Sequence, residues 1–223
     1  MIALLLIPVI SKVIGIGSDI LLLPSNNIFT YYNNTMAEFL AAYKLVKKIE
    51  GGYANDKDDR GGETYKGISR VNFPTWKGWS IIDAIKSHKK GFEALLENDL
   101  NLQALVLDFY KVEFWDELRL DDVTDQGIAT ELFDTGVNMG TGISAIFLQK
   151  ALNVLNNNAQ DYPDIKEDAR MGPLTVGCLN KHKRPNDVLK LLNCLQGARY
   201  VDIARITPAN EKFMRSWLSR VVI

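Results

Sequence analysis

Histidine and cysteine are both scarce, with two residues of each among 223. His88 and His182 lie in separate lysine-rich stretches, where solvated helix ends explain them better than a metal, because no zinc-ligand spacing is present. Cys178 and Cys194 lie among apolar or helical neighbours, so we expect buried free thiols rather than a disulfide. The sequence therefore indicates neither a disulfide scaffold nor a zinc site.

Neither sign of charge is in surplus. The 26 basic and 27 acidic side chains give a formal net charge of -1. Proteins that bind nucleic acid usually carry a basic surplus, and those held to anionic membranes by charge carry a basic stripe. This chain has neither, so we expect no nucleic-acid partner and a ligand that is recognised in a local cleft. A chain of this length can bury a sizeable core as one large domain or two small ones.

A long uninterrupted apolar run is missing as well. Residues 2–10 are apolar, but Lys12 and Asp19 interrupt the next stretch, whereas a membrane span needs about 20 apolar residues with few charges. A secretory signal requires basic residues before its apolar run, and no basic residue precedes this one. Three interpretations of residues 1–35 stay open: an atypical export signal or anchor, an extension outside the fold, or a start that is not the natural one. We expect the folded unit to begin near Met36, and membrane contact, if there is any, to involve only residues 1–24.

Apolar residues recur at helical spacing over most of the remaining chain. We expect helices at about 37–50, 80–88, 91–117, 126–137, 143–156, 186–205 and 207–218, and a short one that opens at Pro173. Residues 53–79 are rich in glycine, aspartate and aromatics, and are expected to form loops and a short hairpin. The pattern predicts a mainly α fold with a small loop or β-hairpin region.

An acidic, glycine-rich stretch over residues 49–69 carries the most specific chemistry. Glu50 lies within about 20° of Phe39 and Tyr43 on the helical wheel, and therefore on the apolar stripe of the first helix. It also lies at the carboxyl end of that helix, where the dipole disfavours a negative charge. Both effects raise the pKa of a carboxyl group, as a general acid in glycosidic cleavage requires. The alternative is a glutamate at a frayed helix end that faces water.

Three further acids in this stretch, Asp56, Asp58 and Asp59, are candidates for an ionised partner that activates water or acts as nucleophile. A solvated acidic turn is the alternative for each of them. The pattern from Asp56 also begins like an EF-hand calcium loop. Arg60 and Gly67, however, occupy the fifth and twelfth positions, where calcium ligands are needed.

Several short motifs resemble glycoside hydrolase family 108, the phage and bacterial N-acetylmuramidases. They are Glu50-Gly51-Gly52-Tyr53, Asn55-Asp56, Asp58-x-Arg60-Gly61-Gly62-x-Thr64-x-x-Gly67-Ile68-Ser69, Phe133-Asp134-x-x-Val137-Asn138-Met139-Gly140, Leu148-Gln149, Gly172-Pro173-x-Thr175, Arg199-Tyr200 and Phe213-x-x-Ser216-Trp217-x-x-Arg220-Val221. The resemblance covers about residues 36–222, and it is looser toward the carboxyl end. It implies a lysozyme-like fold followed by a C-terminal predicted peptidoglycan domain.

The resemblance also implies residue roles. Glu50 is the catalytic acid, and the order Glu50, Asp59, Thr64 is similar to the Glu–Asp–Thr triad of phage-type lysozymes, in which the last two hold the attacking water. The second spacing is one residue shorter here, so Asp56 and Asp58 remain alternatives to Asp59. For substrate contacts we name Tyr53, Tyr65, Asp134 and Asn138. The alternative for Asp134 and Asn138 is a structural hydrogen bond that closes their helix before Gly140. Trp76 and Trp79 are further aromatic candidates, and core packing is the alternative for all four aromatics.

We therefore expect a lysozyme that hydrolyses the β-1,4 bond between N-acetylmuramic acid and N-acetylglucosamine in bacterial peptidoglycan, without a metal or an organic cofactor. Residues 36–125 form the catalytic region and residues 126–223 the helical peptidoglycan domain, packed together into one globular unit. The site of action is the bacterial wall, from the periplasm or the outside, with a phage-encoded protein released at lysis as one route. The alternatives are a non-catalytic peptidoglycan-binding module and a calcium-binding secretion-accessory protein.

Overall fold

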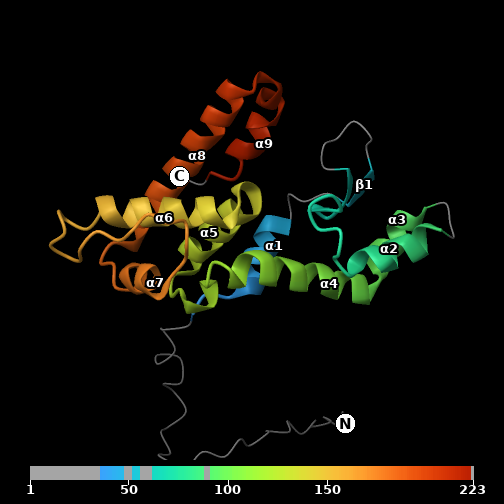
Figure 1. Ribbon diagram of the computed structural model, residues 1–223, viewed down its shortest axis with the longest axis horizontal. Coiled ribbons are helices and arrows are strands. Elements are labelled where there is room, and N and C mark those ends of the chain that lie inside the picture. The colour runs from blue at the N-terminus through green and yellow to red at the C-terminus, as the bar shows by residue number, and fades with distance from the viewer. Residues whose placement is uncertain (1–35, 48–51, 56–61, 88–90, 222–223) are drawn as a thin grey trace, which may run out of the picture. The chain divides into compact units, whose positions relative to one another are not determined.

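The fold is given by a computed structural model, which describes residues 36–47, 52–55, 62–87 and 91–221. The chain divides into two units, residues 1–34 and residues 35–223, and the helices and strands named below belong to the second. The prediction of a mainly α fold with a small β region is confirmed (Figure 1). None of the described helices combines the length and apolar character that crossing a membrane requires.

Helices make up most of the described residues. They are α1 (Phe39–Lys47), α2 (Gly78–Lys86), α3 (Phe92–Asn98), α4 (Leu100–Tyr110), the π-helix η1 (Lys111–Asp116), the 3-10 helix η2 (Leu120–Asp122), α5 (Gln126–Met139), α6 (Thr141–Val154), α7 (Pro173–Asn180), α8 (Pro185–Ile206), the 3-10 helix η3 (Pro208–Phe213) and α9 (Met214–Leu218).

Three short antiparallel strands form one sheet in the order β1 (Tyr53–Asn55), β2 (Glu63–Tyr65) and β3 (Ile68–Ser69). A two-residue turn joins β2 to β3, and both of its residues, Lys66 and Gly67, have positive φ angles of 46° and 79°. Such turns suit the twist of a hairpin, but glycine and asparagine usually supply the left-handed residues. Lys66 is held there by its ammonium group, which lies 2.6 Å from Gln103 Oε1 and 2.7 Å from Glu97 Oε2.

α5 lies at the centre of the core. Its residues 131–136 are all buried, and it packs against α1, α6 and α8 (Figure 1). The ring of Phe133 lies 5.8 Å from the ring of Phe39 on α1 and 5.8 Å from the ring of Trp115 on η1. Aromatic packing of this kind joins the first helix of the unit to its central helix.

Two features differ from the sequence expectation. The single helix expected over about 91–117 is wrong, because Asp99 leaves helical geometry and accepts a hydrogen bond from the backbone N–H of Leu102, which starts α4 as a new helix. The chain then continues beyond α4 as the π-helix η1. Both cysteines are free, as expected, but Cys194 is exposed and only Cys178 is buried.

Candidate active site

The apolar face of α1 is as the sequence predicts. Phe39, Ala42 and Val46 are buried, and Tyr43 is half-buried. α1 ends at Lys47, and Glu50 lies outside the described residues, so its role stays a prediction. The same holds for Asp56, Asp58 and Asp59, and with them for the calcium loop considered as an alternative. Among the residues that the structure describes, no cluster of three or more His, Cys, Asp or Glu side chains could hold a metal ion.

β1 and β2 lie on either side of the acidic segment in the sequence. Asn55 pairs with Glu63 across the two strands, and residues 56–62 lie between them in the chain. Thr64 lies half-buried in the middle of β2, between its partners Ala54 on β1 and Ser69 on β3. Because side chains alternate along a strand, the side chain of Thr64 lies on the face of the sheet opposite to that of Glu63. Asp59 lies outside the described residues, and the strands on either side of its segment in the sequence are paired next to Thr64.

Tyr65 lies inside the core. Its exposed fraction is 0%, its hydroxyl donates to the carbonyl of Leu96 at 3.1 Å, and the side-chain amide of Gln103 donates to that hydroxyl at 2.9 Å. Burial raises the pKa of Tyr65 to about 12. The ring offers no face to a sugar, so the prediction that Tyr65 binds substrate is wrong.

The two tryptophans have different surroundings. Trp79 is buried, and its indole N–H donates to the carbonyl of Phe73 at 2.8 Å, so core packing is its role. Trp76 is half-buried and lines a pocket of about 280 Å³ together with Phe73 and Phe109. Stacking of a sugar on Trp76 stays a prediction.

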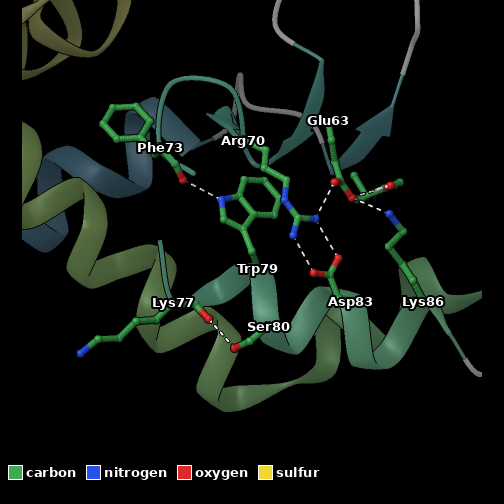
Figure 2. Close-up of polar contacts among 9 residues, drawn as sticks. Glu63, Arg70, Phe73, Lys77, Trp79, Ser80, Asp83 and Lys86 are labelled. Atoms are coloured by element: carbon green, nitrogen blue, oxygen red, sulfur yellow. Dashed lines mark hydrogen bonds and ion pairs between the residues drawn. The ribbon is translucent and has the colours of Figure 1, made fainter. Parts of the chain in front are cut away.

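Glu63 is the centre of an ionic cluster beside the sheet (Figure 2). Its carboxylate accepts hydrogen bonds from Arg70 at 2.8 Å, from Lys86 at 2.5 Å and from the hydroxyl of Tyr53 at 2.8 Å. Arg70 also forms a two-bond pair with Asp83 of α2, at 2.7 and 2.6 Å. The cluster thus ties β1, β2 and α2 together.

The environment of Glu63 keeps it ionised. Burial by itself disfavours the charge, but the hydrogen bonds from Lys86, Arg70 and Tyr53 outweigh it and lower the pKa of Glu63. Glu63 is therefore suited to holding the hairpin rather than to donating a proton. Its place in the cluster is not visible in the sequence, because Arg70 and Lys86 have no spacing that marks them as its partners.

Removing the charge of Glu63 should weaken the fold. We expect Glu63→Gln to lower the free energy of unfolding by about 1–3 kcal/mol at pH 7, since Arg70 and Lys86 lose a charged acceptor. The lowered pKa stabilises the fold above pH 4.5, and this contribution is lost as the pH falls through the folded-state pKa. Urea unfolding should therefore show a smaller difference at pH 3 than at pH 7. Glu93→Gln, at an exposed position of α3, is the matched control, and an equal loss in both variants would contradict the prediction.

Asp134 and Asn138 lie one turn apart on α5, as the sequence predicts. The side-chain amide of Asn138 donates to the Asp134 carbonyl at 2.8 Å and to its carboxylate at 3.3 Å. The same carboxylate lies 2.6 Å from Arg220 Nη1 and accepts a hydrogen bond from Gln196 at 3.0 Å. Burial raises the pKa of Asp134, although Arg220, Gln196 and Asn138 all stabilise its charged form. Asn138 is exposed, and a part in substrate binding stays a prediction for both residues.

A second buried acid, Glu131, lies one turn before Asp134 and was missed by the sequence analysis. It is 7% exposed, and burial together with the neighbouring charge of Asp134 raises its pKa to about 7. Its spacing of three residues from Asp134 is the signal that could have identified it.

Glu131, Asp134 and Arg220 line a pocket of about 240 Å³. Leu45 and Val46, near the end of α1, line the same pocket. The structure therefore brings the end of the helix that leads to Glu50 together with the acids of α5. This is a site where an acid can hold a proton near neutral pH.

The chain matches two families. Residues 43–140 match the family described as Glycosyl hydrolase 108, and residues 144–222 match the family described as Predicted Peptidoglycan domain. These matches confirm the family resemblance of the sequence. Among solved structures the chain is similar to SagA of Brucella abortus, with a TM-score of 0.56 and 21% identity over 82% of this chain and 88% of that chain. At this identity the structural similarity shows the fold alone. No curated protein matches the chain.

Proposed function

We propose that this chain, which carries a glycosyl hydrolase 108 domain over residues 43–140 and a predicted peptidoglycan domain over residues 144–222, is a lysozyme of the bacterial wall. The bond cleaved in this proposal is the β-1,4 bond between N-acetylmuramic acid and N-acetylglucosamine. The observation that carries the proposal is the match over residues 43–140, because this range contains every catalytic and substrate-binding residue named from the sequence.

In the proposed mechanism Glu50 protonates the bridging oxygen of the glycosidic bond. Asp59 orients or deprotonates the attacking water, and Thr64 assists it. Asp56 and Asp58 are the alternatives to Asp59. The sheet supports this arrangement, since the paired strands β1 and β2 lie directly before and after the segment that contains Asp56, Asp58 and Asp59. No step needs a metal or an organic cofactor.

Substrate contacts are proposed for Tyr53, Asp134 and Asn138. Tyr53 is half-buried, and its ring packs edge-on against Phe92, with ring centroids 5.0 Å apart. This contact and the bond from its hydroxyl to Glu63 hold the ring in one orientation. Asp134 lies at the pocket between α1 and α5. A fixed aromatic ring, and a largely apolar pocket with a few polar groups, are features that ligand binding uses.

We propose that the C-terminal region holds the enzyme on its polymeric substrate, in the periplasm or outside the cell. The functional division is proposed near residue 126, with residues 36–125 as the catalytic part and residues 126–223 as the peptidoglycan-binding part. α5 packs on α1 from the first part and on α6 and α8 from the second. The two parts therefore share one core, which suits an enzyme that binds and cleaves the same polymer.

Mass spectrometry of digested peptidoglycan tests the proposed bond. Purified walls incubated with the full chain should release muropeptides that end in a reducing N-acetylmuramic acid. Fragments that end in N-acetylglucosamine would instead identify a glucosaminidase. Walls that pellet with the protein but release nothing would favour the non-catalytic binding module. A calcium-dependent rise in melting temperature without release would favour the calcium-binding alternative.

A further inference from the structure

The C-terminal region contains a pocket that the proposed mechanism does not use. It has a volume of about 450 Å³ and lies between α7 and the loop before it. Tyr162, Pro173, Gly177 and Cys178 line it, and Lys181, His182 and Lys183 come after them at the carboxyl end of α7. The pocket therefore combines an apolar lining with a basic rim.

The aromatic part of the lining is held in place. The hydroxyl of Tyr162 donates to the carbonyl of Leu152 at 2.8 Å, which ties the ring to α6. The ring of His182 packs against the Tyr162 ring with centroids 6.2 Å apart. Burial raises the pKa of the Cys178 thiol, so Cys178 stays neutral and counts as apolar lining. The pocket is thus formed before any ligand arrives.

Gly177 leaves the backbone of α7 open to the pocket. It lies inside α7, where glycine destabilises a helix relative to alanine. A Cβ atom built at Gly177 would meet no atom within 4 Å, so neither packing nor a positive φ requires glycine there. Close approach of a ligand to the helix backbone is a remaining reason for a glycine at this position.

The rim carries one uncompensated charge. Lys183 pairs with Asp161 at 2.9 Å, whereas Lys181 has no ion-pair partner among the residues that the structure describes. In a chain with a net charge of -1, this is a local positive site beside apolar walls. It fits a ligand that has a carboxylate next to aliphatic groups.

We infer that this pocket binds the peptide stem of peptidoglycan, with a stem carboxylate at Lys181 and the stem's methyl groups against Tyr162 and Cys178. The inference rests on the proposed function, because it assumes that peptidoglycan is the substrate. In walls that carry stems, the lactyl carboxyl group of N-acetylmuramic acid is masked by its amide bond to the peptide, so the free carboxylates lie on the stem and the glycan presents neutral hydroxyl and acetamido groups. The stem presents both carboxylates and methyl groups.

Two variants test the inference in the full chain, each with a matched control. Gly177→Phe fills the pocket, and Val154→Phe, which adds the same ring at an exposed position of α6 outside the pocket lining, is its control. Lys181→Glu reverses the charge at the rim, and Lys190→Glu makes the same change at an exposed position of α8. Sedimentation with purified walls should show at least tenfold weaker retention for Gly177→Phe and Lys181→Glu, and unchanged retention for both controls. Thermal melting by circular dichroism shows whether each variant folds. If Gly177→Phe does not fold, the inference is tested by Lys181→Glu, which changes a surface residue.

Competition between walls and synthetic peptides for the protein identifies the chemical groups that the pocket binds. A synthetic stem tripeptide with a free C-terminal carboxylate should displace wild-type protein from walls, and the same peptide with a C-terminal amide should be at least tenfold weaker. Equal retention of Lys181→Glu and wild type, or equal competition by peptide-free glycan strands, would overturn the inference and leave the proposed hydrolase intact. Failure of wild type to release muropeptides would instead overturn the proposed function, since wall retention is measured without any cleavage.

Discussion

Glu50→Gln is expected to abolish wall clearing while wall retention is unchanged. Glutamine has the shape of glutamic acid but cannot donate a proton to the leaving oxygen, and loss of a general acid typically costs about 10²–10⁴ in rate. The measurement is the initial rate of turbidity loss in a suspension of purified walls. Glu38→Gln makes the same change at an exposed residue next to α1 and should clear walls at the wild-type rate.

The result also separates the candidate functions. If Glu50→Gln and wild type clear walls equally fast, Glu50 has no part in the mechanism. The pH profile gives a further check, because a protonated carboxyl group is needed. The rate of wild type should therefore fall as the pH rises above the pKa of Glu50.

Glu131→Gln is expected to stabilise the protein at pH 8 and to leave its stability unchanged at pH 4. The pKa of Glu131 is about 7 in the folded state and 4.5 in its reference state. As the pH rises from 4.5 to 7, the unfolded chain releases this proton while the folded protein keeps it, so the stability of wild type falls over this window. Over this window the free energy of unfolding of wild type falls by about 3 kcal/mol. The glutamine variant does not lose this stability, because its side chain is neutral at every pH.

Melting temperatures at several pH values measure this effect. For a unit of this size we expect Glu131→Gln to melt roughly 6–12 °C above wild type at pH 8. Glu117→Gln, at an exposed site, should have the same melting temperature as wild type at every pH. A constant offset between Glu131→Gln and wild type from pH 4 to pH 8 would show that Glu131 does not titrate in this range. The Thr135 hydroxyl, 3.3 Å from the Glu131 carboxylate, can bond to either side chain, so packing is conserved.

Local signals in the sequence predict much of the fold. The apolar period of α5 and α6, the glycine between them and the proline that opens α7 each act within a few residues, and the expected helices agree with the structure at these places. The hairpin region is also in the expected place, since its glycines and aspartates favour turns. The apolar period continues across Asp99, so the sequence predicts one helix there. The structure has two, because Asp99 has an extended backbone and caps the start of α4.

The environment of the acidic residues could not be predicted in the same way. Arg220 reaches Asp134 across 86 residues of sequence, and Gln196 reaches it across 62. The pKa of Glu131 is raised first by burial and then by the charge of Asp134, and the burial is set by the packing of helices that are distant in the sequence. Tyr65 belongs to a polar stretch, which favours a surface position, but strand alternation turns its side chain toward Leu96 and Gln103.

The central position of α5 limits how the protein can be re-engineered. α5 is part of the segment that matches the glycosyl hydrolase family. α8 and α6 from residue 144 onward, which pack against α5, lie in the segment that matches the peptidoglycan domain. A chimera in which another wall-targeting module replaced residues 144–222 would remove α8 and most of α6 from α5, whose residues 131–136 are all buried. A replacement module therefore has to supply apolar side chains that pack on α5. Exchange of modules in this protein requires redesign of the core as well as choice of a linker.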